Sequence, residues 1–152
     1  MVTFTSHSPA ETQSLGEEWG RHAVGSLVIG LSGDLGAGKT QLVKGLARGL
    51  GFAGRVHSPS FGLINVYSGG RFPLFHLDLY RLETAKQIFD AGLDEYLEPA
   101  GVSVIEWVER WFDPATPGAA LPRGLLPRLY RSVRLETISE LVRRIQYEDF
   151  GT

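Results

Sequence analysis

The chain has 152 residues, of which 43% are hydrophobic and 21% charged, with a formal net charge of −2 and no cysteine. This size and composition predict one globular domain over residues 1–152, while the missing cysteine excludes disulfides, thiolate metal sites and cysteine nucleophiles. The slightly negative charge disfavours nucleic-acid binding by bulk electrostatics. No apolar run approaches the ~18 residues of a membrane span and no signal pattern opens the sequence, so we expect a cytoplasmic protein without a membrane partner.

A short strand and a helix are expected first. Val2–Thr5 is β-prone, and Ser8-Pro9-Ala10-Glu11 fits a capping box with proline at the first helical position. The apolar face of this helix is expected to pack on the sheet, and it carries Thr12, Leu15, Trp19, His22 and Ala23. We interpret His22 as a residue at the edge of the core rather than as a ligand.

A strand, a glycine-rich loop and a helix follow in that order. Ser26–Ser32 is an aliphatic run typical of a buried strand, and residues 42–50 have helical spacing that ends at Gly51. Between them, GDLGAGKT fits G-x-x-x-x-G-K-[ST], a phosphate-binding P-loop. The alternative is a glycine-rich turn with a chance Lys-Thr, but chance gives this motif in under ~1% of chains this long.

The chemistry of such a loop explains its residues. Glycines let backbone N–H groups converge on phosphate oxygens, the lysine reaches the β- and γ-phosphates, and the threonine hydroxyl can join a Mg²⁺ shell. The residues predicted to bind nucleotide here are Gly33, Asp34, Leu35, Gly36, Ala37, Gly38, Lys39, Thr40 and Gln41.

The segment after this helix predicts a loop and an antiparallel hairpin. Ser58-Pro59-Ser60-Phe61 is either a turn before a strand or a segment that approaches the γ-phosphate, as switch loops do. Two β-prone runs, Phe61–Ser68 and Phe72–Tyr80, are separated by Gly69-Gly70, a strong hairpin signal.

Two apolar strands end in carboxylates. The first ends at Asp78, a Walker-B-like position, with His76 on the same face as a candidate hydrogen-bond partner; the second is Val102–Trp107, with Glu106 near its end. Because such strand ends meet at one edge of a sheet, we expect Asp78 and Glu106 to converge on the nucleotide crevice. Two carboxylates beside a triphosphate require a cation between them, which favours Mg²⁺.

The rest of the chain carries weaker signals. We expect a helix over Leu82–Phe89, a short turn over residues 92–97, a surface loop over 113–127, a strand over Leu129–Leu135 and a closing helix whose apolar face holds Ile138, Leu141, Val142 and Ile145. His76–Glu109 holds eight acidic and two basic side chains, either a solvated face or a docking surface for a basic partner. Leu121–Gln146 holds six arginines and two acids, either a solvated edge or a contact for phosphate or tRNA.

The motifs GDLGAGKT, SPSF, HLDLYRL and VIEW, in this order, resemble the TsaE (formerly YjeE) family over about residues 8–136. The family comprises small bacterial P-loop ATPases required to form threonylcarbamoyladenosine in tRNA. The resemblance implies an α/β fold with a mixed, mainly parallel sheet flanked by helices, and it implies ATP and Mg²⁺ as ligands. It also implies TsaB- and TsaD-like partners, with tRNA contacted indirectly or weakly.

The resemblance assigns roles to individual residues. Lys39 would bind the phosphates, Thr40 would bind the phosphates and Mg²⁺, and Glu106 would ligate Mg²⁺. Asp78 would be the acid needed for hydrolysis, and it would contact the metal either directly or through another ligand. The catalytic set is therefore Lys39, Asp78 and Glu106, and the metal set is Thr40, Asp78 and Glu106. Further nucleotide contacts are implied for Thr12, Ser60, Trp107 and Arg131, and a place in the core is the alternative for Trp107. The family usually has threonine at position 60 and proline at position 108, where this chain has Ser60 and Val108.

Three functions compete: an ATPase of a tRNA-modifying complex, a small-molecule P-loop kinase, and a nucleotide-dependent binding module with negligible hydrolysis. A kinase needs an acceptor pocket and usually an arginine-bearing lid, for which the arginine-rich C-terminal segment is the only candidate. The resemblance favours the ATPase. No arginine stands at a position that the sequence obviously directs toward the γ-phosphate, so we expect low activity without partners.

Overall fold

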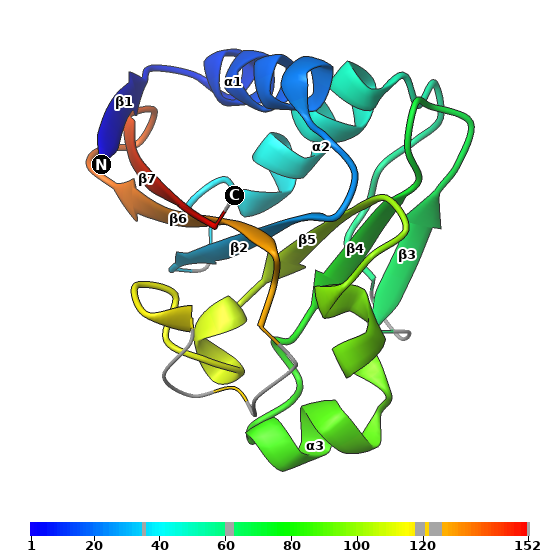
Figure 1. Ribbon diagram of the computed structural model, residues 1–152. Helices are drawn as coiled ribbons and strands as arrows, with labels where there is room; N and C mark the ends of the chain where they lie inside the picture. Colours follow the sequence, from blue (N-terminus) through cyan, green and yellow to red (C-terminus); the bar gives the residue numbers. More distant parts are fainter. Residues whose placement is uncertain (35, 60–62, 118–120, 122–125, 152) are drawn as a thin grey trace.

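The computed structural model describes residues 1–34, 36–59, 63–117, 121 and 126–151. These residues form a mixed seven-stranded sheet in the order β1-β7-β6-β2-β5-β4-β3, with helical layers on both faces (Figure 1). The strands are β1 Val2–Ser6, β2 Leu27–Gly33, β3 Ile64–Tyr67, β4 Leu74–Asp78, β5 Val102–Glu106, β6 Leu129–Thr137 and β7 Arg143–Gly151. The helices are α1 Pro9–His22, α2 Lys39–Leu50 and α3 Ala85–Asp90, with short 3₁₀ helices η1 Leu93–Leu97 and η2 Val108–Arg110. Among the described residues, every helix is too short or too polar to cross a bilayer.

The sheet confirms the predicted α/β architecture. The four adjacent strands β6, β2, β5 and β4 are parallel, whereas β3, β7 and β1 pair antiparallel with their neighbours. The pair β3–β4 is the predicted hairpin. Register places Glu106 of β5 beside Leu31 of β2 and beside Asp78 of β4. The carboxyl ends of the parallel strands therefore meet where the P-loop leaves β2.

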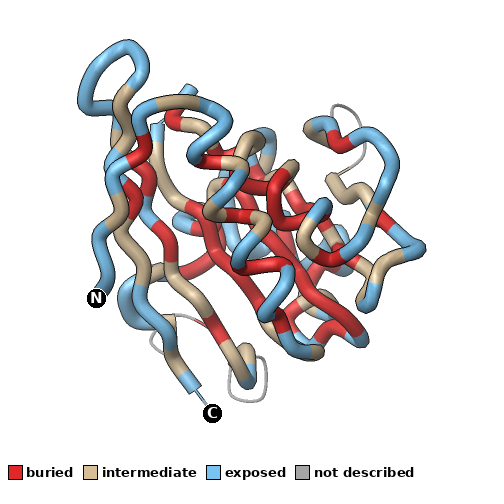
Figure 2. The backbone as a smooth tube through the Cα atoms, turned by 90° about the horizontal axis from the view of Figure 1, so that it is seen from above, coloured by how far each residue is buried: buried red, intermediate tan, exposed pale blue. Residues whose placement is uncertain are grey.

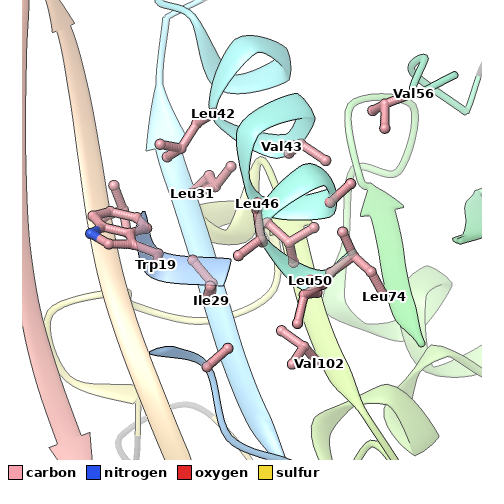
Figure 3. Packing of buried hydrophobic residues seen from close by; sticks show 14 of the residues in the cluster. Trp19, Ile29, Leu31, Leu42, Val43, Leu46, Leu50, Val56, Leu74 and Val102 are labelled. Carbon is pink, nitrogen blue, oxygen red and sulfur yellow. The ribbon is translucent and has the colours of Figure 1, made fainter. Parts of the chain in front are cut away.

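Two apolar clusters hold the layers together. On one face of the sheet, Ile29, Leu31 and Val102 pack against Leu42 and Leu46 of α2 (Figure 3). On the other face, Val28, Leu77 and Ile105 pack against residues of α3, η1 and η2. Figure 2 shows that buried residues concentrate along the central strands and that exposure increases toward β1 and β7. The central strands are covered on both sides, which explains their nearly continuous apolar sequence.

Helix α1 packs mainly on α2, with Trp19 reaching the sheet at an edge-on contact to Tyr147 of β7. Its N-terminus is capped as predicted, because the Ser8 hydroxyl accepts a hydrogen bond from the Glu11 N–H. His22, predicted at the edge of the core, instead extends into solvent and contacts Glu18 at 2.8 Å. Helical spacing alone had placed His22 on the apolar face.

Glycines on both helices let α1 and α2 approach closely. A Cβ added at Gly45 would lie 1.9 Å from the backbone oxygen of Gln13, and one at Gly20 would lie 2.4 Å from that of Leu46. Backbone atoms cannot move aside as a side-chain end can. We expect Gly45→Ala to lower the free energy of unfolding by at least about 2 kcal/mol, measured by urea denaturation. Ser14→Ala, on the exposed side of α1, is the control and should change stability by less than about 0.5 kcal/mol.

The predicted closing helix is wrong: residues 143–151 form β7. Ile138, Leu141, Val142 and Ile145 fit helical spacing, but Ile138 and Leu141 are 52% and 60% exposed. Ile145 and Tyr147 instead alternate toward the core, as strand residues do. Strand β7 pairs with both β6 and β1, so it satisfies backbone groups that a helix would leave unpaired at the edge of β6.

Candidate functional site

A cleft of about 390 Å³ opens at the carboxyl ends of β2, β4 and β5. It lies on the α2 side of the sheet, at the N-terminus of that helix. The residues that line the cleft are Ser8, Pro9, Thr12, Gly36, Gly38, Lys39, Thr40, Gln41, Ser58, Asp78, Tyr80, Glu106, Trp107, Glu140, Leu141 and Arg143. Chain segments far apart in sequence therefore meet around the P-loop.

The loop before α2 has the backbone that the motif predicts. Gly36 and Gly38 have φ values of 81° and 99°, a region that side chains rarely adopt, and Gly38 caps α2. Space alone does not require glycine at position 36, because no atom lies within 4 Å of a Cβ added there. The twelve-residue helix α2 presents its unpaired N–H groups and positive dipole end to the cleft. This geometry suits an anion such as phosphate.

Lys39 is buried at the floor of the cleft, 5% exposed. Its Nζ donates to the carbonyl oxygens of Gly33 and Asp34 at 2.5 and 2.9 Å and lies 4.0 Å from the centre of the Trp107 ring. Desolvation lowers the pKa of Lys39, and the nearby Glu106 carboxylate opposes that shift. A desolvated ammonium held on a loop that can surround phosphate is suited to bind a phosphate oxygen.

The two predicted carboxylates converge as expected. Asp78 and Glu106 are register partners on β4 and β5, and both line the cleft. Burial raises the pKa of Asp78, and the negative charge of Glu106 raises it further. The backbone N–H of Tyr80 donates a hydrogen bond to the Asp78 carboxylate and opposes this increase. Neighbouring carboxylates that disfavour each other's charge provide a place where a cation is stabilising.

The donors fit Mg²⁺. Thr40, Asp78 and Glu106 offer hard oxygen ligands in one cleft. Within the described ranges, no cluster of three or more His, Cys, Asp or Glu side chains could hold a metal by itself. Mg²⁺ in phosphate-transfer sites is bound by one or two carboxylates together with substrate phosphates and water, so a sparse protein donor set agrees with this ion.

Other predicted residues surround the same cleft. The Oγ1 of Thr40 lies 3.3 Å from the Oγ of Ser58, so Ser58 contacts the P-loop. Thr12 and Gln41 line the cleft, with Thr12 hydrogen-bonded to Ser6 at 2.7 Å. Trp107 has a φ of 60° and lines the cleft too, rather than serving only as core. The structure therefore assembles most of the predicted nucleotide set at one place.

Of four further predicted positions, two do not line the cleft but have other places in the structure, and two lie outside the described residues. Asp34 accepts the Ala37 N–H at 3.1 Å through its carbonyl, a bond that shapes the loop. Ala37 is fully buried in the core cluster beneath α2. Leu35 and Ser60, both predicted to contact nucleotide, lie outside the described residues.

Arg131 does not lie at the cleft, so its predicted role is corrected. Its guanidinium forms two hydrogen bonds to the Asp149 carboxylate at 2.6 and 2.9 Å and lies 4.8 Å from the centre of the Trp19 ring. Arg131 pairs in register with Ile29, in the middle of β2, whereas the P-loop leaves the far end of that strand. Arg131 lines a different hollow, beside Trp19 and Tyr147.

Arg143 is a cleft residue that sequence reasoning did not single out. It begins β7, and its guanidinium donates to the Gly36 carbonyl at 3.3 Å and to the Ser139 carbonyl at 2.7 Å. Glu140 and Leu141, in the turn before β7, line the cleft beside it. The signal in the sequence was the alternation of Ile145 and Tyr147, which would have placed a hairpin here. Tyr80, two residues after Asp78, was also missed.

Comparisons with known proteins identify the family to which this chain is similar. A family model described as "Threonylcarbamoyl adenosine biosynthesis protein TsaE" matches residues 6–138. A protein named tRNA threonylcarbamoyladenosine biosynthesis protein TsaE from Bacillus subtilis is 44% identical over 100 residues, covering 66% of this chain and 62% of that protein. A protein of the same name from Treponema pallidum is 46% identical over 105 residues, covering 69% of this chain and 77% of its own length.

A similarly named Synechocystis protein is 44% identical over 102 residues, which cover 62% of this chain and 64% of that protein. The match thus spans less than two thirds of the Synechocystis and Bacillus relatives. The fold is also shared: the crystal structure of Bacillus subtilis YdiB superposes with a TM-score of 0.74 at 30% identity, over 96% of this chain and 83% of the other.

Proposed function

This chain belongs to the TsaE family of threonylcarbamoyl adenosine biosynthesis proteins, and we propose that it is a Mg²⁺-dependent ATPase acting in formation of threonylcarbamoyladenosine in tRNA. One observation carries the proposal. Lys39, Thr40, Asp78 and Glu106 line a single cleft at the N-terminus of α2. A buried cation, a hydroxyl and two carboxylates around an anion-binding helix end match the parts used for phosphoryl transfer.

Each residue has a distinct role in this proposal. The backbone of residues 36–40 and the Lys39 ammonium bind and orient the phosphates. Thr40 and Glu106 would hold Mg²⁺, with Asp78 close behind, and the ion would neutralise charge on the β- and γ-phosphate oxygens. Asp78, which lines the cleft and whose pKa is raised by burial, would orient the attacking water. Positioning and electrostatics then account for hydrolysis, because little covalent chemistry is required of the protein.

The test is an assay of ATP with the purified chain, with and without candidate small-molecule acceptors. The proposal predicts free phosphate and ADP in every reaction. Phosphorylated acceptor in place of free phosphate would instead establish the kinase. Nucleotide binding without phosphate release, even beside partner proteins, would establish a binding module.

Substitutions of the two carboxylates should affect different steps, Mg²⁺ binding for Glu106 and turnover for Asp78. Glu106→Gln should reduce the gain in nucleotide affinity that Mg²⁺ provides by about tenfold, because the ion loses a charged ligand. Asp78→Asn should leave that gain within about threefold of the parent and lower turnover by about 10². Fluorescent-nucleotide titrations across Mg²⁺ concentrations, with phosphate release measured in parallel, check both. Equal Mg²⁺ dependence in Glu106→Gln and the parent would remove Glu106 from the metal site.

Partners belong to the same proposal. We propose that the chain acts with TsaB- and TsaD-like proteins and contacts tRNA only indirectly or weakly. Three arginines of the basic C-terminal segment form ion pairs, Arg131 with Asp149 and both Arg134 and Arg144 with Glu136. Paired cations attract phosphate less, so this edge favours a solvated surface over a nucleic-acid interface. Omitting the chain from a reconstituted multi-turnover synthesis of threonylcarbamoyladenosine should reduce product; unchanged product would contradict the role.

A further inference from the structure

A continuous hydrogen-bonded path leads from the cleft into the core and back to the loop at its rim. Glu106 Oε2 lies 2.5 Å from His76 Nε2, and His76 Nδ1 lies 3.0 Å from the Tyr67 hydroxyl. That hydroxyl lies 2.9 Å from the backbone oxygen of His57. The next residue is Ser58, whose Oγ lies 3.3 Å from Thr40 Oγ1. The path therefore joins Thr40 and Glu106, the two residues proposed to hold Mg²⁺.

We propose that His76 and Tyr67 are positioning residues: they fix the Glu106 carboxylate for the metal and tie it to the backbone of the His57–Ser58 segment. This inference rests on the proposed function, because it takes Glu106 as a Mg²⁺ ligand. Neither side chain lines the cleft, since His76 is fully buried and Tyr67 is 5% exposed. They therefore act through Glu106 and the loop rather than on the nucleotide.

Burial makes the bond to Glu106 consequential. Glu106 is 3% exposed, and a buried carboxylate without hydrogen-bond donors is costly. A ring N–H at His76 Nε2 can donate to the Glu106 carboxylate oxygen and so satisfies this buried acceptor. Such a bond selects one carboxylate rotamer. Outer partners of this kind hold metal ligands in place, and their loss typically reduces metal affinity 10- to 100-fold.

Strand register makes the path stiff. His76 lies on β4 between Leu74 and Asp78 on the face toward α2, and its register partner on β3 is Asn65. Asn65 Nδ2 also donates to the His57 carbonyl at 2.9 Å, so two β3 side chains hold that carbonyl. The Tyr67 ring packs against Phe52, with centroids 5.0 Å apart. The loop beside Thr40 is thus anchored to the same pair of strands that positions Glu106.

Tyr67→Phe tests the path by removing one hydroxyl from it. Nucleotide affinity is measured with Mg²⁺ and with EDTA, and the ratio of the two is the Mg²⁺ gain. We expect Tyr67→Phe to lower this gain about threefold, because it acts one bond away from Glu106, with affinity in EDTA unchanged. Amide hydrogen exchange at residues 56–58 should also accelerate. The matched control is Tyr96→Phe, whose ring packs on Phe75 on the other face and should change neither quantity.

Two changes at His76 separate positioning from packing. His76→Gln can still place an N–H near the Glu106 carboxylate but loses the link to Tyr67, so it should lower the Mg²⁺ gain only about threefold, as Tyr67→Phe does. His76→Leu fills similar space without a donor and should lose about tenfold. Equal losses in both variants, in step with lower melting temperatures, would show a structural role only and overturn the proposal. If His76→Leu fails to fold, Tyr67→Phe and His76→Gln still decide.

The outcomes distinguish this inference from the function on which it rests. A parent protein whose nucleotide affinity ignores Mg²⁺ would overturn the proposed metal site, and with it the positioning role. A parent with clear Mg²⁺ dependence, together with a Tyr67→Phe variant that matches Tyr96→Phe in both measurements, would overturn the positioning role alone.

Discussion

Lys39→Ala is expected to lower the rate of ATP hydrolysis by about 10²- to 10³-fold and to weaken nucleotide binding at least tenfold. The Lys39 ammonium is the positively charged side chain of the P-loop, so it can offset negative charge that develops on the transferring phosphoryl group. Fixed donors of this kind contribute 10² to 10³ in rate when they act in a desolvated site. Lys39 fits that description because it is almost fully buried and its pKa is lowered by desolvation.

The control for this substitution is Lys44→Ala, five residues further along α2. Lys44 lines a separate hollow, with Phe52 and Arg55, and does not line the cleft. It should leave hydrolysis within about twofold of the parent, because surface charges are screened. Steady-state phosphate release and nucleotide titration measure both variants. The melting temperature of Lys39→Ala should stay close to that of the parent, and near-parental hydrolysis in a folded Lys39→Ala protein would contradict the proposed role of the loop.

The sequence was informative where residue type and local structure coincide. The P-loop motif requires a strand before it and a helix after it, and β2 and α2 occupy those positions. Gly69-Gly70 predicted the β3–β4 hairpin, and each apolar strand that ends in a carboxylate proved to be β4 or β5. Because parallel strands align their carboxyl ends, local patterns at Asp78 and Glu106 sufficed to predict that these side chains meet.

The sequence was misleading where tertiary contacts decide. Four apolar residues between 138 and 145 fit a helix, yet residues from 143 onward pair with the edge of β6 and form β7. That single error hid Arg143, because only a hairpin turn brings the start of β7 to the P-loop. Arg131 was misassigned for a related reason: its place along β6 relative to the cleft depends on the register with β2. The path from Glu106 to His57 likewise spans three strands and a loop, so no local pattern reveals it.

The isolated chain is expected to hydrolyse ATP slowly, and a complex of its TsaB- and TsaD-like partners is expected to raise the rate by about 10³-fold or more. In the structure, Lys39 donates to two carbonyls of its own loop and Arg143 donates to carbonyls of the β6–β7 turn. Lys39 is the cation that we assign to the phosphates. The other cation among the lining residues, Arg143, is already hydrogen-bonded to carbonyls of the turn. An arginine supplied by a partner contributes ~10³ to 10⁵ in such hydrolysis, and ordering of the segment that starts at Ser58 is the other route.

The acidic surface that would receive the partner is narrower than the sequence indicated. Of the eight acids between His76 and Glu109, Asp78 and Glu106 line the cleft, so they are not available for docking. Asp94 and Glu95 lie on η1, in the layer on the opposite face of the sheet from α1 and α2 (Figure 1). Glu95 is exposed and Asp94 is partly exposed. Long-range attraction to a basic partner depends on charges that solvent reaches and weakens with salt.

Reversing both charges, Asp94→Lys with Glu95→Lys, should therefore reduce stimulation by the partners about tenfold while basal hydrolysis stays within about twofold of the parent. The control carries the same change in net charge elsewhere, Glu18→Lys on α1 with Glu148→Lys on β7. Phosphate release is measured for each protein alone and across a partner titration at low and high salt, because the difference should shrink as salt screens it. Equal stimulation of the reversed and control proteins would remove η1 as the docking surface. A parent chain that alone matches the rate of the full complex would refute the dependence on partners itself.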